Sequence, residues 1–452
     1  MTHHRRALEV LADAALAGPW DVASIHARFE RCVRAEGEAQ RRFLRHAARR
    51  LAVTFPEAPT DRAALIGRLR ALRERAVSRD PGAGGALRSF HVTRALLPAR
   101  VMRPAPFAAP PLLDAADVAS HLELRLDALD WLADVRGMNP KARDARLHHY
   151  VCRLVPKRSG GARLLEAPKP TLAIAQRRLL DRVLCAFPVH EAAKGFVPGR
   201  DLLDHVGAHV GKRVVVRMDL TDFFAQIGFA RVRGLFAVGG YPREVAGLLA
   251  GLATTSTPRR VLRALRGPEH RALRERLAAS HLPQGAPSSP MLANLVAFGL
   301  DRRLAGLARA LGGVYTRYAD DLAFSGDAGF ERRIDALLPR VGAIALEEGL
   351  TPNHRKTRVM RAGGRQELCG VIVNRKLSVR RAERERLEAI LVDCARRGPE
   401  AANREGHADF RAHLDGRVGW IERLDPRRGA SLRARFDAIS WDRGATPPAA
   451  PT

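Results

Sequence analysis

The sequence predicts an α+β fold in which helical regions at both ends flank a central region of short strands. Apolar residues recur at three- and four-residue spacing before residue 80 and again after residue 377, as on one face of an amphipathic helix. Between these regions, "KRVVVRMDL" is a continuous apolar run of the kind found in strands buried on both faces. "GGVYTRYADDLAFSG" predicts a hairpin that turns at residues 319–321.

The first part of the chain, residues 1–80, is predicted to be helical because "ALEVLADAALA" and "AALIGRLRALRERAV" show helical periodicity. Residues 81–113 are rich in glycine and proline, which interrupt helices, and we predict a linker there. Helical periodicity resumes after residue 113, with Asp114 or Asp117 as the N-cap.

The middle of the chain alternates strands and helices. "YVCRLVPKRSGGARLLEAP" predicts two short strands joined by a turn at residues 157–161, and "LAIAQRRLLDRVLCAF" a helix after them. The buried strand ends on Asp219, and helices are predicted from residue 223 to about residue 277. "LPQGAPSSP" opens a further helix, and "RRIDALLPRVGAIALEEG" predicts one packed behind the hairpin.

Charge is the most unusual property of the composition. The 77 Lys and Arg residues outnumber 48 Asp and Glu, so the formal net charge is +29. This balance favours a polyanionic partner, because neutralised phosphates release counterions; the alternative is a basic solvated surface on an arginine-rich protein.

The five cysteines form no Cys-x-x-Cys pair, which argues against a zinc site or a disulfide framework. No apolar run is long enough to span a membrane, and the N-terminus makes a poor signal peptide, so a cytoplasmic protein with no membrane partner is expected.

Two carboxylate sources are predicted to meet on one sheet. Asp219 ends the buried strand, and Asp320, with Asp321 beside it, lies at the tip of the hairpin. Aspartate also occurs in turns for its own hydrogen bonds, so the Asp320–Asp321 pair alone proves little. Carboxylates brought together repel each other unless a cation lies between them. Two Mg²⁺ ions roughly 4 Å apart are a common solution, activating a hydroxyl on one side and stabilising a leaving pyrophosphate on the other.

Seven sequence blocks together resemble a known family. "VPKRSGGARLLEAPKPTLAIAQRRLL", "AAKGFVPGRDLLD", "RMDLTDFFAQI", "LPQGAPSSP", "YADD", "EEGLTPNHRKTRV" and "LCGVIVN" occur in the order and approximate spacing of reverse transcriptases, and more narrowly of bacterial retron-type ones. The resemblance covers residues 114–437 and implies an RNA-directed DNA polymerase with a right-hand fold. We therefore expect the fingers at 114–210, the palm with a mixed or antiparallel sheet at 211–376 and the helical thumb and tail at 377–452. The N-terminal helical extension precedes all three.

The resemblance also implies roles for individual residues. Asp219, Asp320 and Asp321 match the metal-binding catalytic carboxylates, and Lys356 matches the residue that acts on the leaving pyrophosphate. The positions that match nucleotide-binding residues are Lys157, Arg163, Leu220, Phe224, Gln284 and Gly285. Phe224 corresponds to the gate that excludes a 2′-hydroxyl, although core packing beside Phe223 is an alternative. An ordinary charged hairpin is the alternative reading of Lys157 and Arg163, and Ser289 with Pro290 is expected to start a helix.

The partners implied by the resemblance are a noncoding RNA that serves as template and primer, its DNA product, deoxynucleoside triphosphates, two Mg²⁺ ions and an effector protein in anti-phage defence. Two blocks depart from the retron pattern. "HVGAH" at residues 205–209 replaces Asn-Ala-x-x-His, and Leu368-Cys369-Gly370 replaces Val-Thr-Gly. The alternatives left open are a reverse transcriptase of abortive-infection or intron-derived lineage, and a catalytically silent RNA-binding protein.

Overall fold

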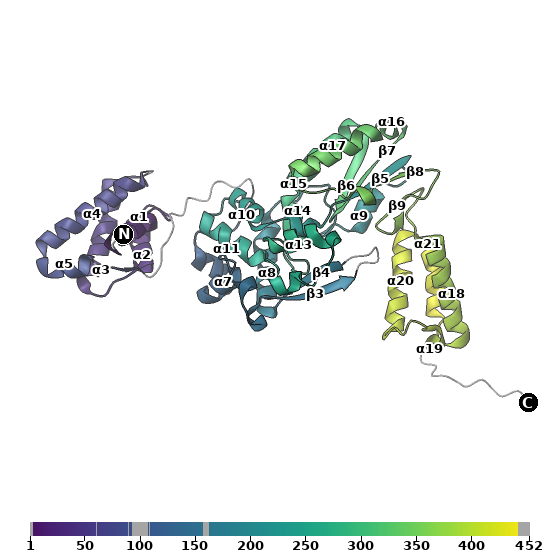
Figure 1. Cartoon of the computed structure of the whole chain (residues 1–452), viewed down its shortest axis with the longest axis horizontal. Helices are drawn as coiled ribbons and strands as arrows, with labels where there is room; N and C mark the ends of the chain where they lie inside the picture. Colours follow the sequence, from purple (N-terminus) through teal and green to yellow (C-terminus); the bar gives the residue numbers. More distant parts are fainter. Residues whose placement is uncertain are drawn as a thin grey trace, which may run out of the picture. The chain divides into compact units, whose positions relative to one another are not determined.

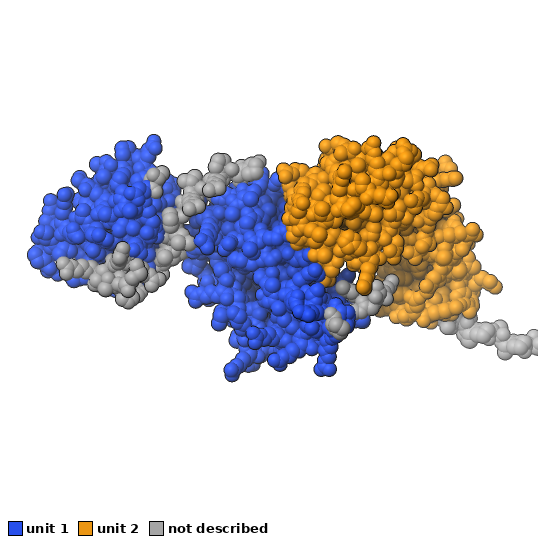
Figure 2. Space-filling view, turned by 45° about the horizontal axis from the view of Figure 1, so that its top comes forward, with its two compact units in different colours: residues 1–188, 224–296 blue, residues 189–223, 297–452 orange. Residues whose placement is uncertain are grey.

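The computed structural model describes residues 3–59, 61–88, 90–92, 107, 109–156 and 162–441. The chain divides into two compact units, a first unit of residues 1–188 and 224–296 and a second unit of residues 189–223 and 297–452 (Figure 2). Each unit is therefore built from two separate segments of the sequence. The combination of helices with antiparallel strands confirms the predicted α+β class.

The N-terminal part of the first unit is a helical cluster (Figure 1). Its helices are α1 (His3–Ala15), α2 (Val22–Cys32), α3 (Glu38–Thr54), α4 (Arg62–Arg79) and α5 (Gly84–Arg88). Their apolar faces meet in a core where Leu11, Phe29 and Leu44 are fully buried. Asp21 caps α2 by accepting a hydrogen bond from the backbone N–H of Ser24 at 2.8 Å.

The region predicted as a linker, residues 81–113, differs from the prediction in its first part. Residues 84–88 form α5, and the strand β2 (His91–Val92) pairs antiparallel with β1 (Val33–Arg34). Glycines in "GAGGALR" did not prevent a short helix because Leu87 is buried in the core of the helical cluster. Tertiary packing therefore outweighed the weak local propensity.

The remainder of the first unit combines helices with one hairpin. Its helices are α6 (Ala115–His121), α7 (Leu126–Ala133), α8 (Pro170–Arg182), α10 (Phe229–Val238), α11 (Arg243–Ala253), α12 (Arg259–Leu262), α13 (Arg271–Ala278) and α14 (Ser289–Val296). The hairpin strands are β3 (Tyr150–Pro156) and β4 (Ala162–Pro168), paired antiparallel as predicted. Of the two N-cap candidates, Asp114 caps α6, because its carboxylate accepts hydrogen bonds from the backbone of Ala116 and Asp117. The helix α14 begins at Ser289, as expected.

A four-stranded antiparallel sheet forms the centre of the second unit. The strand order is β6-β7-β5-β8, with bounds β6 (Gly313–Tyr318), β7 (Asp321–Gly326), β5 (Val214–Asp219) and β8 (Arg358–Arg361). The strands β6 and β7 form the predicted hairpin, and β5 is buried along almost its whole length. The helices of this part are α9 (Leu202–Gly207), α15 (Phe298–Ala310), α16 (Ala328–Glu331) and α17 (Ile334–Glu347).

Helices complete the second unit after the sheet. They are α18 (Arg381–Arg397), α19 (Pro399–Ala402), α20 (Phe410–Leu424) and α21 (Pro426–Asp437), preceded by the short antiparallel pair β9 (Glu367–Leu368) and β10 (Val371–Ile372). Leu387, Leu414 and Val418 are fully buried in one core with Val371. No helix in the described part of the chain is long and apolar enough to cross a membrane.

Candidate active site

The sheet of the second unit brings the three predicted carboxylates together. Asp219, the last residue of β5, is paired in register with Asp321, the first residue of β7. Asp320 lies in the two-residue turn between β6 and β7, and its backbone carbonyl accepts a hydrogen bond from Leu220 N–H at 2.9 Å. Residues that are far apart in the sequence thus meet because antiparallel pairing aligns the end of one strand with the start of the next.

The hairpin turn is held by a buried ion pair. Ala319 has a left-handed backbone, with φ of 55°, which suits a tight hairpin turn but is unusual without glycine. The fully buried Arg317 donates from Nη1 to the Ala319 carbonyl oxygen at 3.0 Å, and from Nε and Nη2 to the two carboxylate oxygens of Asp301 at 2.8 and 2.6 Å. Tyr315 donates its hydroxyl to the same carboxylate at 2.8 Å. This network fixes the turn that presents Asp320.

Cationic side chains accompany two of the carboxylates. The Lys356 ammonium lies 3.0 and 2.9 Å from the two oxygens of Asp219, and Asn353 Nδ2 donates to the same carboxylate at 3.3 Å. The Arg217 guanidinium forms a bidentate pair with Asp321 at 2.7 and 3.0 Å from Nη2. Each partner balances a negative charge that would otherwise be poorly solvated beside its neighbours.

Asp320 is the carboxyl group without such a compensating pair. Burial, followed by the negative charges of Asp219 and Asp321, raises its pKa to about 6. A cation placed beside these oxygens would remove that penalty, and carboxylate oxygens are the hard ligands that Mg²⁺ prefers. Within the described ranges, no group of three or more His, Cys, Asp or Glu side chains already has the arrangement of a metal site. The oxygen donors are nevertheless of the type that a divalent cation takes, and in this structure Lys356 and Arg217 occupy two of the three carboxylates.

Two buried histidines hydrogen-bond to side chains of both hairpin strands. His209 hydrogen-bonds Ser325 Oγ at 2.7 Å and Thr316 Oγ1 at 2.8 Å, and His205 Nδ1 lies 2.7 Å from the same threonine oxygen. Both histidines are fully buried, and they belong to the "HVGAH" block at residues 205–209. This block thus has a structural function in joining β6 to β7 through side-chain hydroxyls.

The buried histidines predict acid sensitivity of the second unit. Burial lowers the pKa of His205 to about 4 and that of His209 to about 3, whereas the unfolded chain titrates near 6.5. Their contribution to stability is therefore fully present above about pH 6.5. It is lost as the pH falls towards 4 for His205 and towards 3 for His209, at up to about 1.4 kcal/mol per pH unit for each histidine. Urea unfolding at about pH 7.5 and about pH 5 should show a smaller loss for His209→Gln than for the wild type. Equal losses of unfolding free energy in His209→Gln and the wild type would contradict the lowered pKa of His209.

The predicted nucleotide-binding residues divide between the two units. Leu220 is buried in the second unit beside Asp320. The other described members, Arg163, Phe224, Gln284 and Gly285, belong to the first unit, and Lys157 lies outside the described residues. Arg163 is exposed on β4, and Phe224 is half-buried in the 3₁₀ turn Phe223–Gln226.

Gln284 and Gly285 pack directly against strand β4. The backbone N–H of Glu166 donates to the carbonyl of Gln284 at 2.8 Å. Gly285 has φ of 131°, and a Cβ there would lie 3.1 Å from the Glu166 carbonyl oxygen, so glycine is required by both conformation and space. Glu166 is itself buried and bonds His281 and Thr257, each at 2.7 Å. The loop therefore packs closely against the hairpin of the first unit.

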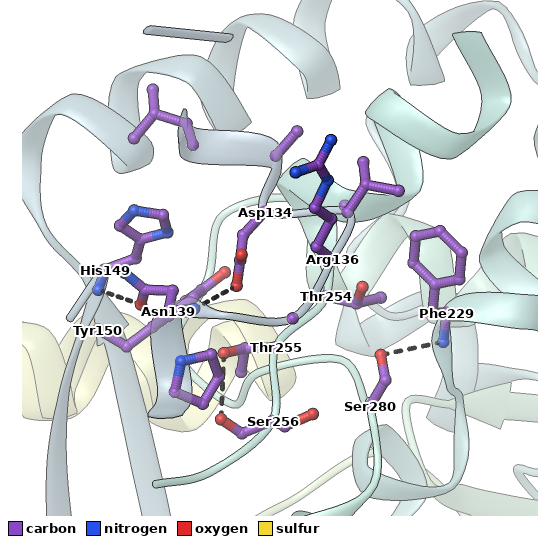
Figure 3. A pocket seen from close by; sticks show the side chains of 16 residues that line it. Asp134, Arg136, Asn139, His149, Tyr150, Phe229, Thr254, Thr255, Ser256 and Ser280 are labelled. Carbon is purple, nitrogen blue, oxygen red and sulfur yellow. Dashed lines mark hydrogen bonds between the residues drawn. The ribbon is translucent and has the colours of Figure 1, made fainter. Parts of the chain in front are cut away.

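A separate polar pocket of about 250 Å³ lies in the first unit (Figure 3). Asp134, Asn139 and His149 line it together with several hydroxyl side chains. The Asp134 carboxylate already accepts hydrogen bonds from two backbone N–H groups, those of Met138 and Asn139 at 2.8 Å each. None of the predicted site residues lines this pocket, so it does not belong to the carboxylate site.

Comparison with known proteins identifies the family. Residues 155–380, half of the chain, match the family model of the reverse transcriptase (RNA-dependent DNA polymerase). The chain belongs to the reverse transcriptase family. The match includes all four strands of the sheet and the carboxylates it carries, and it confirms the polymerase fold class and the enzyme class predicted from the sequence blocks.

Relatives place the chain among retron-type reverse transcriptases. The retron Mx65 reverse transcriptase of Myxococcus xanthus is 47% identical over 64% of this chain and 65% of the relative. The retron Mx162 reverse transcriptase of the same organism is 36% identical over 75% of this chain and 69% of the relative. The matched region thus spans about two thirds of the length of these relatives. Among solved structures, a telomerase from Candida albicans is 10% identical, with a TM-score of 0.34 over 64% of this chain and 59% of that one, which is too low to support an inference.

Sequence reasoning missed three residues that form ion pairs at the carboxylates or at the hairpin turn beside them: Arg217, Arg317 and Asp301. Arg217 and Arg317 are charged residues inside apolar strands, and Arg217 lies two residues before Asp219, hence on the same face of β5. A charge in a buried strand requires a partner, which was a usable signal that a functional or structural pair exists. Asp301, by contrast, lies in an amphipathic helix where nothing in the sequence distinguishes it from a solvated carboxylate.

Proposed function

We propose that this chain is an active RNA-directed DNA polymerase of retron type, which makes a short single-stranded DNA from a structured noncoding RNA. The observation that carries the proposal is the meeting of Asp219 with Asp320 and Asp321 on one sheet of a reverse transcriptase. In the proposed reaction, a hydroxyl of the RNA serves as the first primer, and deoxynucleoside triphosphates are added with release of pyrophosphate.

Three carboxylates are proposed to hold two Mg²⁺ ions. Asp219 and Asp320 supply the main oxygen ligands, and Asp321 joins them when Arg217 releases it. Bound metal would activate the attacking hydroxyl and stabilise the negative charge that develops on the phosphates. Lys356 is proposed to neutralise the leaving pyrophosphate, and its distance of 2.9 Å from Asp219 Oδ2 supports a location at the reacting phosphates.

The first unit is proposed to contribute nucleotide-binding residues from both the finger region and the palm region. Lys157 and Arg163 would contact the triphosphate, Phe224 would exclude a 2′-hydroxyl, and Gln284 with Gly285 would pack on the templating pair. Leu220, which belongs to the second unit, is likewise proposed to bind the nucleotide. The hydrogen bond between Gln284 and β4 and the close approach of Gly285 to the same strand support this proposal. The proposed fingers, palm and thumb are residues 114–210, 211–376 and 377–452.

The proposed partners are a noncoding RNA, its DNA product and an effector protein, acting in the cytoplasm in anti-phage defence. The net charge of +29 supports nucleic-acid binding, because each neutralised phosphate releases counterions. Both blocks that depart from the retron pattern supply side chains that hydrogen-bond to the β6–β7 hairpin in the second unit. His205 and His209 brace the hairpin, and Cys369 donates weakly to Asp321 Oδ2 at 3.6 Å.

Expression of the gene with its flanking DNA in a bacterial host tests the proposed function. We expect a discrete short DNA that survives RNase treatment and is absent from the Asp320→Asn, Asp321→Asn double variant. Failure to find this DNA, with synthesis on a supplied primed RNA, would remove the self-primed retron reaction and keep the polymerase. Absence of synthesis in both assays, with intact RNA binding, would support a silent RNA-binding protein instead.

A further inference from the structure

Strained backbone is concentrated in the unit that carries the catalytic carboxylates. In the described part of the chain, six residues other than glycine have a positive φ, and four of them lie in the second unit: Phe196, Asp222, Ala319 and Cys369. Ala319 precedes Asp320, and Cys369 hydrogen-bonds Asp321. Such strain persists only where the surrounding structure enforces it, and it is typical of functional sites.

Phe196 is the unexpected member of this group. Its φ is 60°, a conformation that bulky side chains rarely adopt, and its side chain is 54% exposed. A strained phenylalanine that does not pack in a core gains little stability from its ring. Single exposed apolar residues are common on protein surfaces, but the combination with left-handed backbone is not.

The segment that carries Phe196 is tied to the catalytic hairpin on its N-terminal side. Lys194 N–H donates to the Arg317 carbonyl at 2.8 Å, and Arg317 N–H donates to the Ala192 carbonyl at 2.7 Å. Gly195 lies so close that a Cβ would be 3.1 Å from the backbone nitrogen of Ala319. These contacts hold the residues that directly precede Phe196 against the turn.

The ring of Phe196 lies beside that of Tyr318, which precedes the turn. Their centroids are 5.9 Å apart with an interplanar angle of 42°. Proteins bind nucleic-acid strands by combining basic charge with exposed aromatic rings on which bases stack. We propose that Phe196 contacts a nucleotide of the bound primer–template by packing its ring against a base or sugar face. This inference rests on the proposed polymerase function and adds a strand-binding residue to it.

Replacement of Phe196 by glycine separates a binding function from a structural one. Glycine accepts a positive φ without strain, so Phe196→Gly should keep or raise the thermal midpoint while it removes the ring. We expect the affinity for a primed RNA template, measured by fluorescence anisotropy without nucleotides, to fall roughly 5- to 100-fold. Phe196→Trp should retain the affinity within about twofold, because it preserves an aromatic face.

Phe298→Ala is the matched control, because Phe298 is also exposed, at 39%, in the second unit but has ordinary helical backbone. The affinity of Phe298→Ala for the primed template should equal that of the wild type.

Unchanged affinity in Phe196→Gly would overturn the inference, and so would a lower thermal midpoint, which indicates a structural role. A raised KM for the nucleotide with unchanged template affinity would assign the ring to the incoming nucleotide instead and likewise overturn it. Because binding is measured without synthesis, these outcomes stand even if the polymerase proposal fails.

Discussion

Replacing Asp219 or Asp320 with asparagine is expected to lower DNA synthesis by roughly a thousandfold while RNA binding stays unchanged. Asparagine has nearly the same shape but no charge, so the site loses its attraction for a divalent cation. The effect should be large at Asp320, whose carboxyl group is half-buried, has a pKa raised to about 6 and has no compensating basic partner as close as those of its neighbours. Single-nucleotide incorporation on a primed RNA, beside anisotropy with the same RNA, measures both quantities.

Asp327→Asn provides the matched control for this experiment. Asp327 directly follows the same hairpin, is exposed and makes no side-chain cap to α16, so its replacement removes one charge without touching the site. Its synthesis rate should remain that of the wild type. Synthesis by Asp219→Asn within about threefold of the control would contradict the metal-binding assignment.

The buried pair of Arg317 and Asp301 predicts the second large effect. Arg317→Met should lower the free energy of unfolding by about 3–5 kcal/mol, because it leaves the Asp301 carboxylate buried and unpaired. It should also lower DNA synthesis, since the Arg317 hydrogen bond to the Ala319 carbonyl, in the turn that carries Asp320, is then lost. Urea unfolding and nucleotide incorporation measure the two consequences separately.

A double variant distinguishes stability from positioning at this pair. Arg317→Met combined with Asp301→Leu removes both charges, so much of the lost stability should return, while Tyr315 loses its acceptor. Synthesis should nevertheless stay low, because the hydrogen bond to Ala319 is still absent. Recovery of full synthesis together with stability would show that the pair contributes to folding alone.

Local patterns predicted the central elements of the fold well. The apolar run ending in Asp219 became β5, and the alternation around "YADD" became the hairpin of β6 and β7. Both predictions depend on side-chain periodicity, which a strand imposes directly on its own sequence. The prediction at residues 81–113 was wrong in its first part, because α5 is stabilised by distant apolar contacts through Leu87 rather than by its glycine-rich sequence.

The sequence predicted the carboxylates of the candidate site but not the charged residues that pair with them or hold the turn, because only local patterns are visible in a sequence. Asp219, Asp320 and Asp321 carry signals in short motifs, and the structure brings them together. Arg217 and Asp301 matter through partners far away in the sequence, and no local pattern reveals which charges will pair. Phe196 stood inside a recognised block, yet its exposure and its strained backbone are visible only in three dimensions.

The sequence by itself determined the α+β class, the family resemblance and the carboxylates at the ends of two strands, because periodicity and motif spacing are local properties. Only the tertiary structure decided the register that sets Asp219 opposite Asp321 and the ion pair that holds the turn. It also decided that Lys356 and Arg217 lie against the carboxylates. These features depend on long-range pairing, in which burial makes an unpaired charge or hydrogen-bonding group too costly to leave without a partner.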